Sequence, residues 1–99
     1  MTGTAGETAA STLKRTLRIA NKRGLHARAA AKFVRTAGQF DAIIRVSFKG
    51  QDVSGLSIMG LMMLAAGIGS SIELSCSGRQ ALEAMTALSA LVEGKFGED

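Results

Sequence analysis

The chain has 99 residues, of which 46% are hydrophobic, and its formal net charge is +4 at pH 7. This length suits one domain with one core, and the hydrophobic content excludes a disordered chain. The single cysteine, Cys76, excludes an intramolecular disulfide and indicates a reducing compartment.

The hydrophobic pattern argues against secreted and membrane-spanning proteins. Residues 1–12 are mostly small and polar, without the apolar stretch of a secretory signal. The longest mostly apolar run, residues 58–68, is too short to cross a membrane. We therefore expect a soluble cytoplasmic domain. The mild basic charge, concentrated in residues 14–35, suits nucleic acid, an acidic protein partner or neither.

The first half of the chain predicts a tail, a strand and a helix. Residues 1–11 are rich in Gly, Ala, Thr and Ser, and we expect a flexible tail before a domain at residues 12–96. From residue 13 the alternation predicts a half-buried strand, with Arg15 as an exception on the apolar face. Residues 21–25 form a loop, and residues 27–37 form an alanine-rich helix that ends at Gly38. The inward positions are Leu13, Leu17, Ile19, Ala30, Phe33, Val34 and Ala37.

The second half predicts three strands and two helices. A strand at residues 42–48 turns through Lys49 and Gly50 into a short strand at residues 51–54. Ser57 opens a short helix that extends to about residue 66, before the glycines at 67 and 69. A strand at residues 71–77 precedes a last helix at residues 79–93. The inward positions are Ile44, Val46, Phe48, Ile72, Leu74, Cys76, Leu82, Met85, Leu88, Leu91 and Val92.

The element order is β-α-β-β-α-β-α. It predicts an α+β open-faced sandwich, because the helices must cover the apolar face of the sheet. The order alone does not identify a family, since several ferredoxin-like domains share its first six elements.

His26 is the only histidine, and it lies where the first strand–loop segment meets the first helix. The free N–H groups and the dipole of a helix N-terminus attract phosphate, and an imidazole can accept a phosphoryl group as a nucleophile. Histidine is not a usual helix cap, so capping does not explain its position. A partly solvated, chemically idle loop histidine is the alternative.

The residues around His26 suit a phosphoryl group. Arg28 can bring its guanidinium to a phosphate, and the N–H groups of the first helical turn, beginning at Ala27, can donate to it. Gly24 allows a close approach of the loop, and Leu25 can anchor the loop to the core. The amide of Asn21 can orient a ring nitrogen of the histidine.

Residues 24–30 read GLHARAA, and residues 53–62 read VSGLSIMGLM. The first segment resembles the active-site segment, and the second the regulatory-serine segment, of the HPr family of histidine-containing phosphocarriers. The resemblance covers about residues 13–95. It implies an HPr-like open-faced β-sandwich, with a four-stranded antiparallel sheet covered on one face by three helices.

The resemblance implies that His26 is phosphorylated on Nδ1 by phosphorylated enzyme I, which takes its phosphoryl group from phosphoenolpyruvate. His26 would then pass the group to a IIA-type domain, with Arg28 beside it. Such a protein is a carrier and no self-contained enzyme, and we expect no cofactor and no metal site. An HPr kinase/phosphorylase and regulatory proteins are candidate further partners. We expect a monomer that binds neither nucleic acid nor membrane. Ala29 stands where the family commonly has proline, which favours a proteobacterial, nitrogen-branch (NPr-like) member.

The second segment predicts a regulatory site and a docking surface. Ser57 suits the N-cap of the short helix, and the resemblance makes it a regulatory phosphorylation site. If Leu61 and Leu64 pack on the sheet, then Ile58, Met59 and Met62 point outward and form a partner-docking patch. We expect this patch and the first helix to form one surface around His26.

Three alternatives have less support. A nucleic-acid-binding module of similar topology needs exposed aromatics, and the chain has no Trp or Tyr. One His and one Cys cannot supply a zinc tetrad. A family member that regulates by binding, with little carrier activity, stays open because of Ala29.

Overall fold

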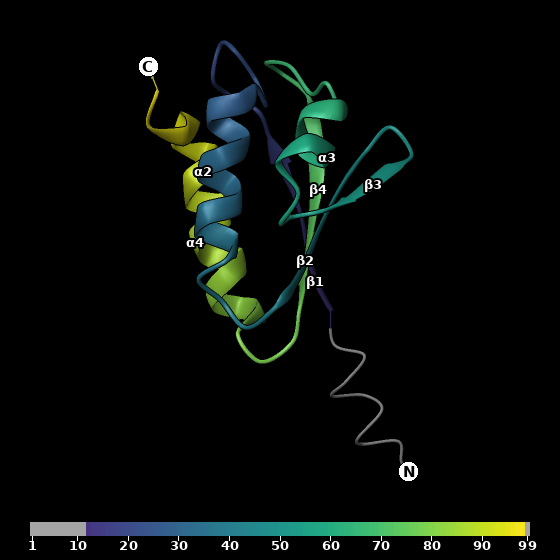
Figure 1. The fold of residues 1–99 in the computed structure, drawn as a ribbon, viewed down its shortest axis with the longest axis vertical. Coiled ribbons are helices and arrows are strands. Elements are labelled where there is room, and N and C mark those ends of the chain that lie inside the picture. The colour runs from purple at the N-terminus through teal and green to yellow at the C-terminus, as the bar shows by residue number, and fades with distance from the viewer. Residues whose placement is uncertain (1–11, 99) are drawn as a thin grey trace.

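The computed structural model describes residues 12–98, which form one antiparallel sheet with helices packed on one of its faces (Figure 1). The predicted fold class and element order are confirmed, with the addition of a 3-10 helix, η1, after the last α-helix. The predicted tail, residues 1–11, lies outside the described residues. The elements are β1 (Thr12–Arg18), α2 (Ala27–Ala37), β2 (Ile43–Phe48), β3 (Gln51–Ser54), α3 (Ile58–Met63), β4 (Ser71–Ser77), α4 (Ala81–Glu93) and η1 (Lys95–Gly97).

The strand order across the sheet is β1-β4-β2-β3, and every neighbouring pair is antiparallel. The register aligns Val46 of β2 with Leu74 of β4, and Leu17 of the edge strand β1 with Ile72 of β4. Because side chains alternate along a strand, this register places all four on the face that the helices cover. Burial of these side chains with those of α2 and α4 forms one core.

Three predictions about side-chain position or helix length are wrong. Leu13 is 38% exposed, because it lies near the start of β1, close to the end of the sheet. Leu82 is exposed in the first turn of α4, which begins at Ala81 and not at residue 79. The helix after Ser57 ends at Met63, because Ala65 has a left-handed backbone with φ of 56°.

The exception predicted at Arg15 has a structural reason. Its guanidinium donates to a carboxylate oxygen of Glu93 at the end of α4, at 3.2 Å. Both side chains are about half exposed, so the charge stays in water while the ion pair joins the edge strand to the helix.

The sheet offers no aromatic platform for nucleic-acid bases. Phe33 and Phe96 are buried, and Phe40 and Phe48 pack against the core. Base stacking needs exposed rings, so the nucleic-acid alternative has no stacking surface within residues 12–98. Over the same residues, no helix is both long and apolar enough to span a membrane.

Candidate functional site around His26

His26 is the N-cap residue of α2, and its backbone is extended, with φ of −75° and ψ of 177°. The carbonyl of His26 accepts the first helical hydrogen bond from the N–H of Ala30 at 2.9 Å, but the imidazole makes no capping bond. The side chain is 16% exposed. The ring is therefore free for other chemistry, beside N–H groups of the first helical turn that have no partner within the helix.

The loop before His26 is fixed by two backbone features. Gly24 has φ of +64°, and a Cβ built on it would lie 2.5 Å from the carbonyl oxygen of Ala66. The N–H of Leu25 donates to that same oxygen at 3.0 Å, and the Leu25 side chain is buried. The roles predicted for Gly24 and Leu25 in positioning the loop thus have a direct geometric basis, and the loop is bonded to the segment after α3.

Glu98 binds the ring of His26, a contact that the sequence did not predict. One carboxylate oxygen of Glu98, Oε2, lies 2.6 Å from His26 Nε2, and the other accepts from the amide of Asn21 at 3.0 Å. These two hydrogen bonds, together with the nearby positive charge of Lys32, hold the pKa of Glu98 below its ordinary value. The carboxylate is therefore ionised at neutral pH.

Asn21 does not orient the ring directly, which corrects the prediction. Its amide nitrogen donates to the carbonyl of Gly24 at 2.9 Å and to Glu98. Both partners are acceptors, so the nitrogen of the amide must face them. The amide acts on His26 through Glu98. Its own oxygen is buried and has no hydrogen-bond partner within residues 12–98.

Glu98 reaches His26 because the chain turns sharply after α4. We call residues 94–98 the C-terminal hook. Lys95 and Phe96 both have left-handed backbones, with φ of 59° and 56°. The Phe96 ring is buried in the core, and Lys32 of α2 donates to the Phe96 carbonyl at 2.7 Å. The hook is thus fixed at two points before Glu98, and it brings the end of the described chain to the start of α2 (Figure 1).

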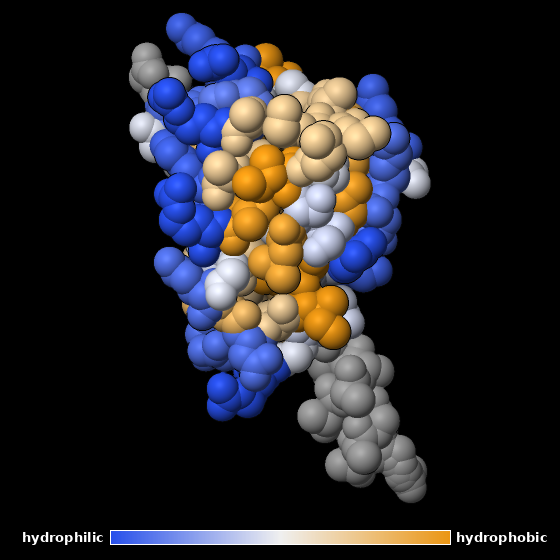
Figure 2. Space-filling view, in the orientation of Figure 1, coloured by the Kyte–Doolittle hydropathy of each residue, from blue (hydrophilic) through white to orange (hydrophobic). Residues whose placement is uncertain are grey.

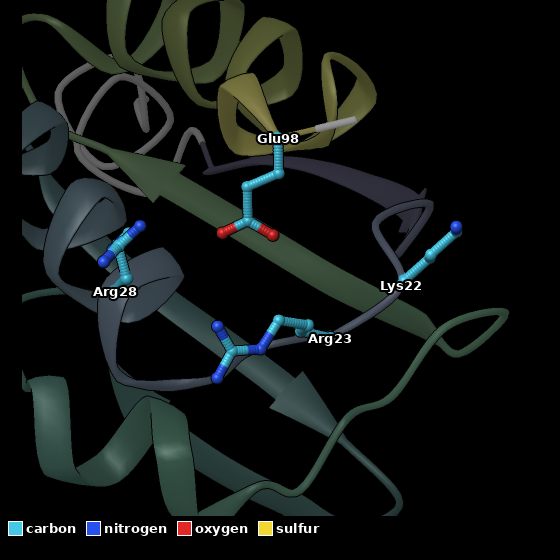
Figure 3. Close-up of a pocket in the computed structure, with 4 residues that line it drawn as sticks. All are labelled: Lys22, Arg23, Arg28 and Glu98. Atoms are coloured by element: carbon cyan, nitrogen blue, oxygen red, sulfur yellow. The ribbon is translucent and has the colours of Figure 1, made fainter.

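Three cations surround the carboxylate of Glu98. A pocket of about 240 Å³ is lined by Lys22, Arg23, Arg28 and Glu98. Figure 3 shows Arg28 to the left of the carboxylate, Arg23 below it and Lys22 to its right. Guanidinium groups bind phosphate oxygens well, so the pocket suits an anion such as a phosphoryl group. Lys22 and Arg23 were not singled out from the sequence, although both lie in the loop before His26.

No group of three or more His, Cys, Asp or Glu side chains within residues 12–98 is arranged to hold a metal ion. The lone cysteine, Cys76, is buried on β4, and burial raises the pKa of its thiol to about 11. A thiol with that pKa is a poor nucleophile near neutral pH. Cys76 therefore belongs to the core, as its inward position predicts.

The second segment forms an apolar surface on α3. Leu61 and Leu64 are buried as predicted, while Ile58, Met59, Met62 and Met63 are exposed; we call these four exposed residues the α3 patch. Figure 2 shows apolar side chains gathered in this part of the surface. Ser57 caps α3, because its hydroxyl oxygen accepts from the N–H of Gly60 at 2.9 Å.

Comparison with known proteins identifies the family. The protein-family model described as "PTS HPr component phosphorylation site" matches residues 13–94. Phosphocarrier protein HPr of Cupriavidus necator is 51% identical over 86 residues, which cover 87% of this chain and 97% of that protein. Phosphocarrier protein NPr of Shewanella violacea is 44% identical over 86 residues, which cover 87% of this chain and 94% of that protein.

A solved structure agrees with these relatives. The HPr of Thermoanaerobacter tengcongensis has a TM-score of 0.84 to this chain at 45% identity, and the match covers 88% of this chain and 98% of that chain. The shared fold, the family match over most of the chain and the high identity agree with the two motifs around His26 and Ser57. The chain belongs to the HPr family of phosphocarrier proteins of the phosphotransferase system.

Proposed function

We propose that His26 is the residue that carries the phosphoryl group in this phosphocarrier. The main support is that its ring lies at the N-terminus of α2 without capping the helix, and binds Glu98, which lines a pocket together with three cations. The helix terminus and the cations favour a phosphate at this position, and an imidazole is a suitable nucleophile.

The proposed step is a displacement at phosphorus. The Nδ1 lone pair of His26 attacks the phosphoryl group of phosphorylated enzyme I, and the bond from phosphorus to enzyme I breaks. Arg28 and the N–H groups that begin at Ala27 donate to the phosphoryl oxygens. A nucleophile of a IIA-type domain later attacks the same phosphorus, and the bond to Nδ1 breaks.

Labelling with radioactive phosphoenolpyruvate and enzyme I tests this proposal. We expect an acid-labile, base-stable label on the wild-type protein and no label on His26→Ala. Arg28→Ala should slow labelling about tenfold, since a charge-assisted hydrogen bond contributes more than 1 kcal/mol. Arg45→Ala is the matched control, because Arg45 is an exposed arginine that pairs with Asp52 on the sheet. An unlabelled wild-type protein would refute the proposal.

We infer that the α3 patch docks enzyme I and the IIA-type domain. The loop that leaves α3 is bonded to the residue before His26, so the patch and the ring are structurally linked. Met59→Glu should slow both transfers. Leu82→Glu is the matched control, because Leu82 and Met59 are both 66% exposed but lie on different helices. Equal transfer rates for the two variants would contradict docking on this patch.

Ser57 is proposed as a regulatory phosphorylation site for an HPr kinase/phosphorylase. Ser57 is partly exposed next to the α3 patch, and a phosphate on it would add negative charge to the docking surface. Incubation with such a kinase and ATP, followed by mass spectrometry, should give one phosphate on Ser57. Ser57→Ala should abolish it. Phosphate on Ser54 instead would show that the site is misplaced.

Ala29 supports two narrower proposals. It lies buried in the first turn of α2, where the family commonly has proline. We infer from it a nitrogen-branch carrier, which should transfer faster to a nitrogen-type than to a sugar-type IIA domain. Faster transfer to the sugar type would overturn that inference. The alternative, a regulatory member with little carrier activity, requires that His26 label slowly even at high enzyme I concentration.

A further inference from the structure

Glu98 is the strongest feature that the family resemblance does not explain. Its carboxylate contacts a ring nitrogen of His26 in a pocket lined by cations. A carboxylate cannot donate a hydrogen bond to a phosphate, so phosphate binding does not explain its presence there. Asn21, in the loop after β1, donates a hydrogen bond to Glu98, and Lys32 of α2 donates one to the hook before it. An arrangement built from three separate parts of the chain indicates a specific task.

The first part of that task follows from hydrogen-bond roles. An ionised carboxylate only accepts hydrogen bonds. The 2.6 Å contact therefore requires a proton on Nε2 of His26. In a neutral imidazole one nitrogen carries the proton and the other carries the lone pair. Glu98 thus leaves the lone pair on Nδ1, which is the atom that attacks phosphorus in the proposed function.

The second part follows from charge. When the Nδ1 lone pair forms a bond to phosphorus, the ring keeps its Nε2 proton and becomes positively charged. The carboxylate of Glu98 already lies against that proton, on the opposite edge of the ring from the new phosphorus bond. It stabilises the developing positive charge in the way that a carboxylate orients and stabilises the histidine of a hydrolase triad.

We propose that Glu98 is a positioning residue for phosphoryl transfer: it selects the Nε2-protonated form of His26 and stabilises the positive charge that the ring gains at Nδ1. The proposal rests on the proposed function of His26. Asn21 and the C-terminal hook hold the carboxylate in place.

Glu98→Gln tests the proposal with little change in shape. An amide can offer either its oxygen or its nitrogen to the ring, so it neither selects one protonated form nor carries a charge. Glu93→Gln is the matched control, because it removes the same charge from the exposed ion pair with Arg15. The core is untouched in both variants, and far-UV circular dichroism verifies their folding.

Two measurements are made on each variant. Nitrogen-15 NMR of His26 at neutral pH reports which ring nitrogen is protonated, and it requires no phosphoryl donor. The initial rate of phosphorylation by phosphoramidate, a small donor that needs no docking surface, reports the reactivity of the ring. We expect a protonated Nε2 in the wild type and Glu93→Gln. We expect a mixture of both forms and a rate about tenfold lower in Glu98→Gln.

The outcomes separate this proposal from the proposed function. A wild-type ring protonated on Nδ1, or equal rates and equal nitrogen-15 shifts in Glu98→Gln and wild type, would overturn the role of Glu98. Failure of the wild type to accept phosphate from enzyme I would instead overturn the proposed function. In that case the NMR measurement and the phosphoramidate rate would still decide the role of Glu98.

Discussion

Gly24→Ala should destabilise the fold and displace the loop that carries His26. An alanine with the left-handed backbone of Gly24 costs about 1–2 kcal/mol. Its Cβ would also lie 2.5 Å from the carbonyl oxygen of Ala66, so the two backbone segments must separate. That separation breaks the hydrogen bond from the Leu25 N–H to the same oxygen, which contributes about 0.5–1.5 kcal/mol. We expect a total loss of about 1.5–3.5 kcal/mol.

Gly50→Ala isolates the effect of the close approach. Gly50 also has a left-handed backbone, with φ of +80°, but a Cβ on it would meet no atom within 4 Å. Its substitution should therefore cost only the backbone strain, about 1–2 kcal/mol. The free energy of unfolding is measured by urea denaturation with far-UV circular dichroism, because the chain has no Trp or Tyr for fluorescence.

The comparison has one decisive outcome. If Gly24→Ala loses no more stability than Gly50→Ala, then the contact with Ala66 does not hold the loop, and our account of how His26 is positioned is wrong. If Gly24→Ala loses more, the backbone chemical shifts of Leu25 and His26 should change as well. The labelling of His26 should then slow, since its ring moves relative to Glu98.

Four further changes test other parts of the structure. Ala29→Pro should raise the free energy of unfolding, measured by urea denaturation, by about 0.4–1 kcal/mol, because proline restricts the unfolded chain and the N–H it removes makes no hydrogen bond within the first helical turn. A decrease would show that the buried site has no room for the proline ring. Burial raises the pKa of the Cys76 thiol to about 11, so this thiol should resist iodoacetamide at pH 8 in the native protein and react quickly in urea. Fast labelling of the native protein would contradict its burial. The carboxylate of Glu98 faces His26, Lys32 and the cations Lys22, Arg23 and Arg28, and its pKa is lowered from the ordinary value of 4.5, so its interactions stabilise the hook fully above pH 4.5 and are lost as the pH falls through the lower pKa of the folded protein. The amide chemical shifts of residues 95–98 should follow that titration, and shifts that change only above pH 5 would contradict it. Lys32→Met should increase fast motion of residues 95–98 in NMR relaxation while α4 stays rigid, and unchanged relaxation would show that the Lys32 bond does not hold the hook.

Local sequence patterns predicted the elements well where each pattern is carried by neighbouring residues. The helix at residues 27–37 and the strand at residues 71–77 have the bounds that their apolar periods indicate. The pattern failed at element ends. Leu82 has the correct helical spacing, but at the first turn of α4 there is no layer beyond it to cover its side chain. The periodicity of a helix indicates which face a side chain lies on, but the side chain is buried only where another element packs against that face.

The candidate site divides in the same way. His26, Arg28 and Gly24 lie within five consecutive residues, so their proximity is visible in the sequence. Lys22 and Arg23 are equally near, and they were missed because basic loop residues are usually only solvated. Asn21 was assigned to the ring, but its amide binds the residue that binds the ring. Direction within a hydrogen-bond network depends on tertiary structure and has no local signal.

Glu98 could not be predicted because its position depends on the conformation of the hook. Two successive left-handed residues cost about 1–2 kcal/mol each, and nothing in the identities of Lys95 and Phe96 favours that backbone. Burial of the Phe96 ring recovers about 1.5–3 kcal/mol, so the strained turn and the buried ring nearly balance. The remaining stabilisation must come from the hydrogen bonds of Lys32, Asn21 and His26. Since one of these three bonds is made by the ring itself, a change in the charge of His26 alters the stability of the hook, and the position of the hook in turn sets the protonation of the ring.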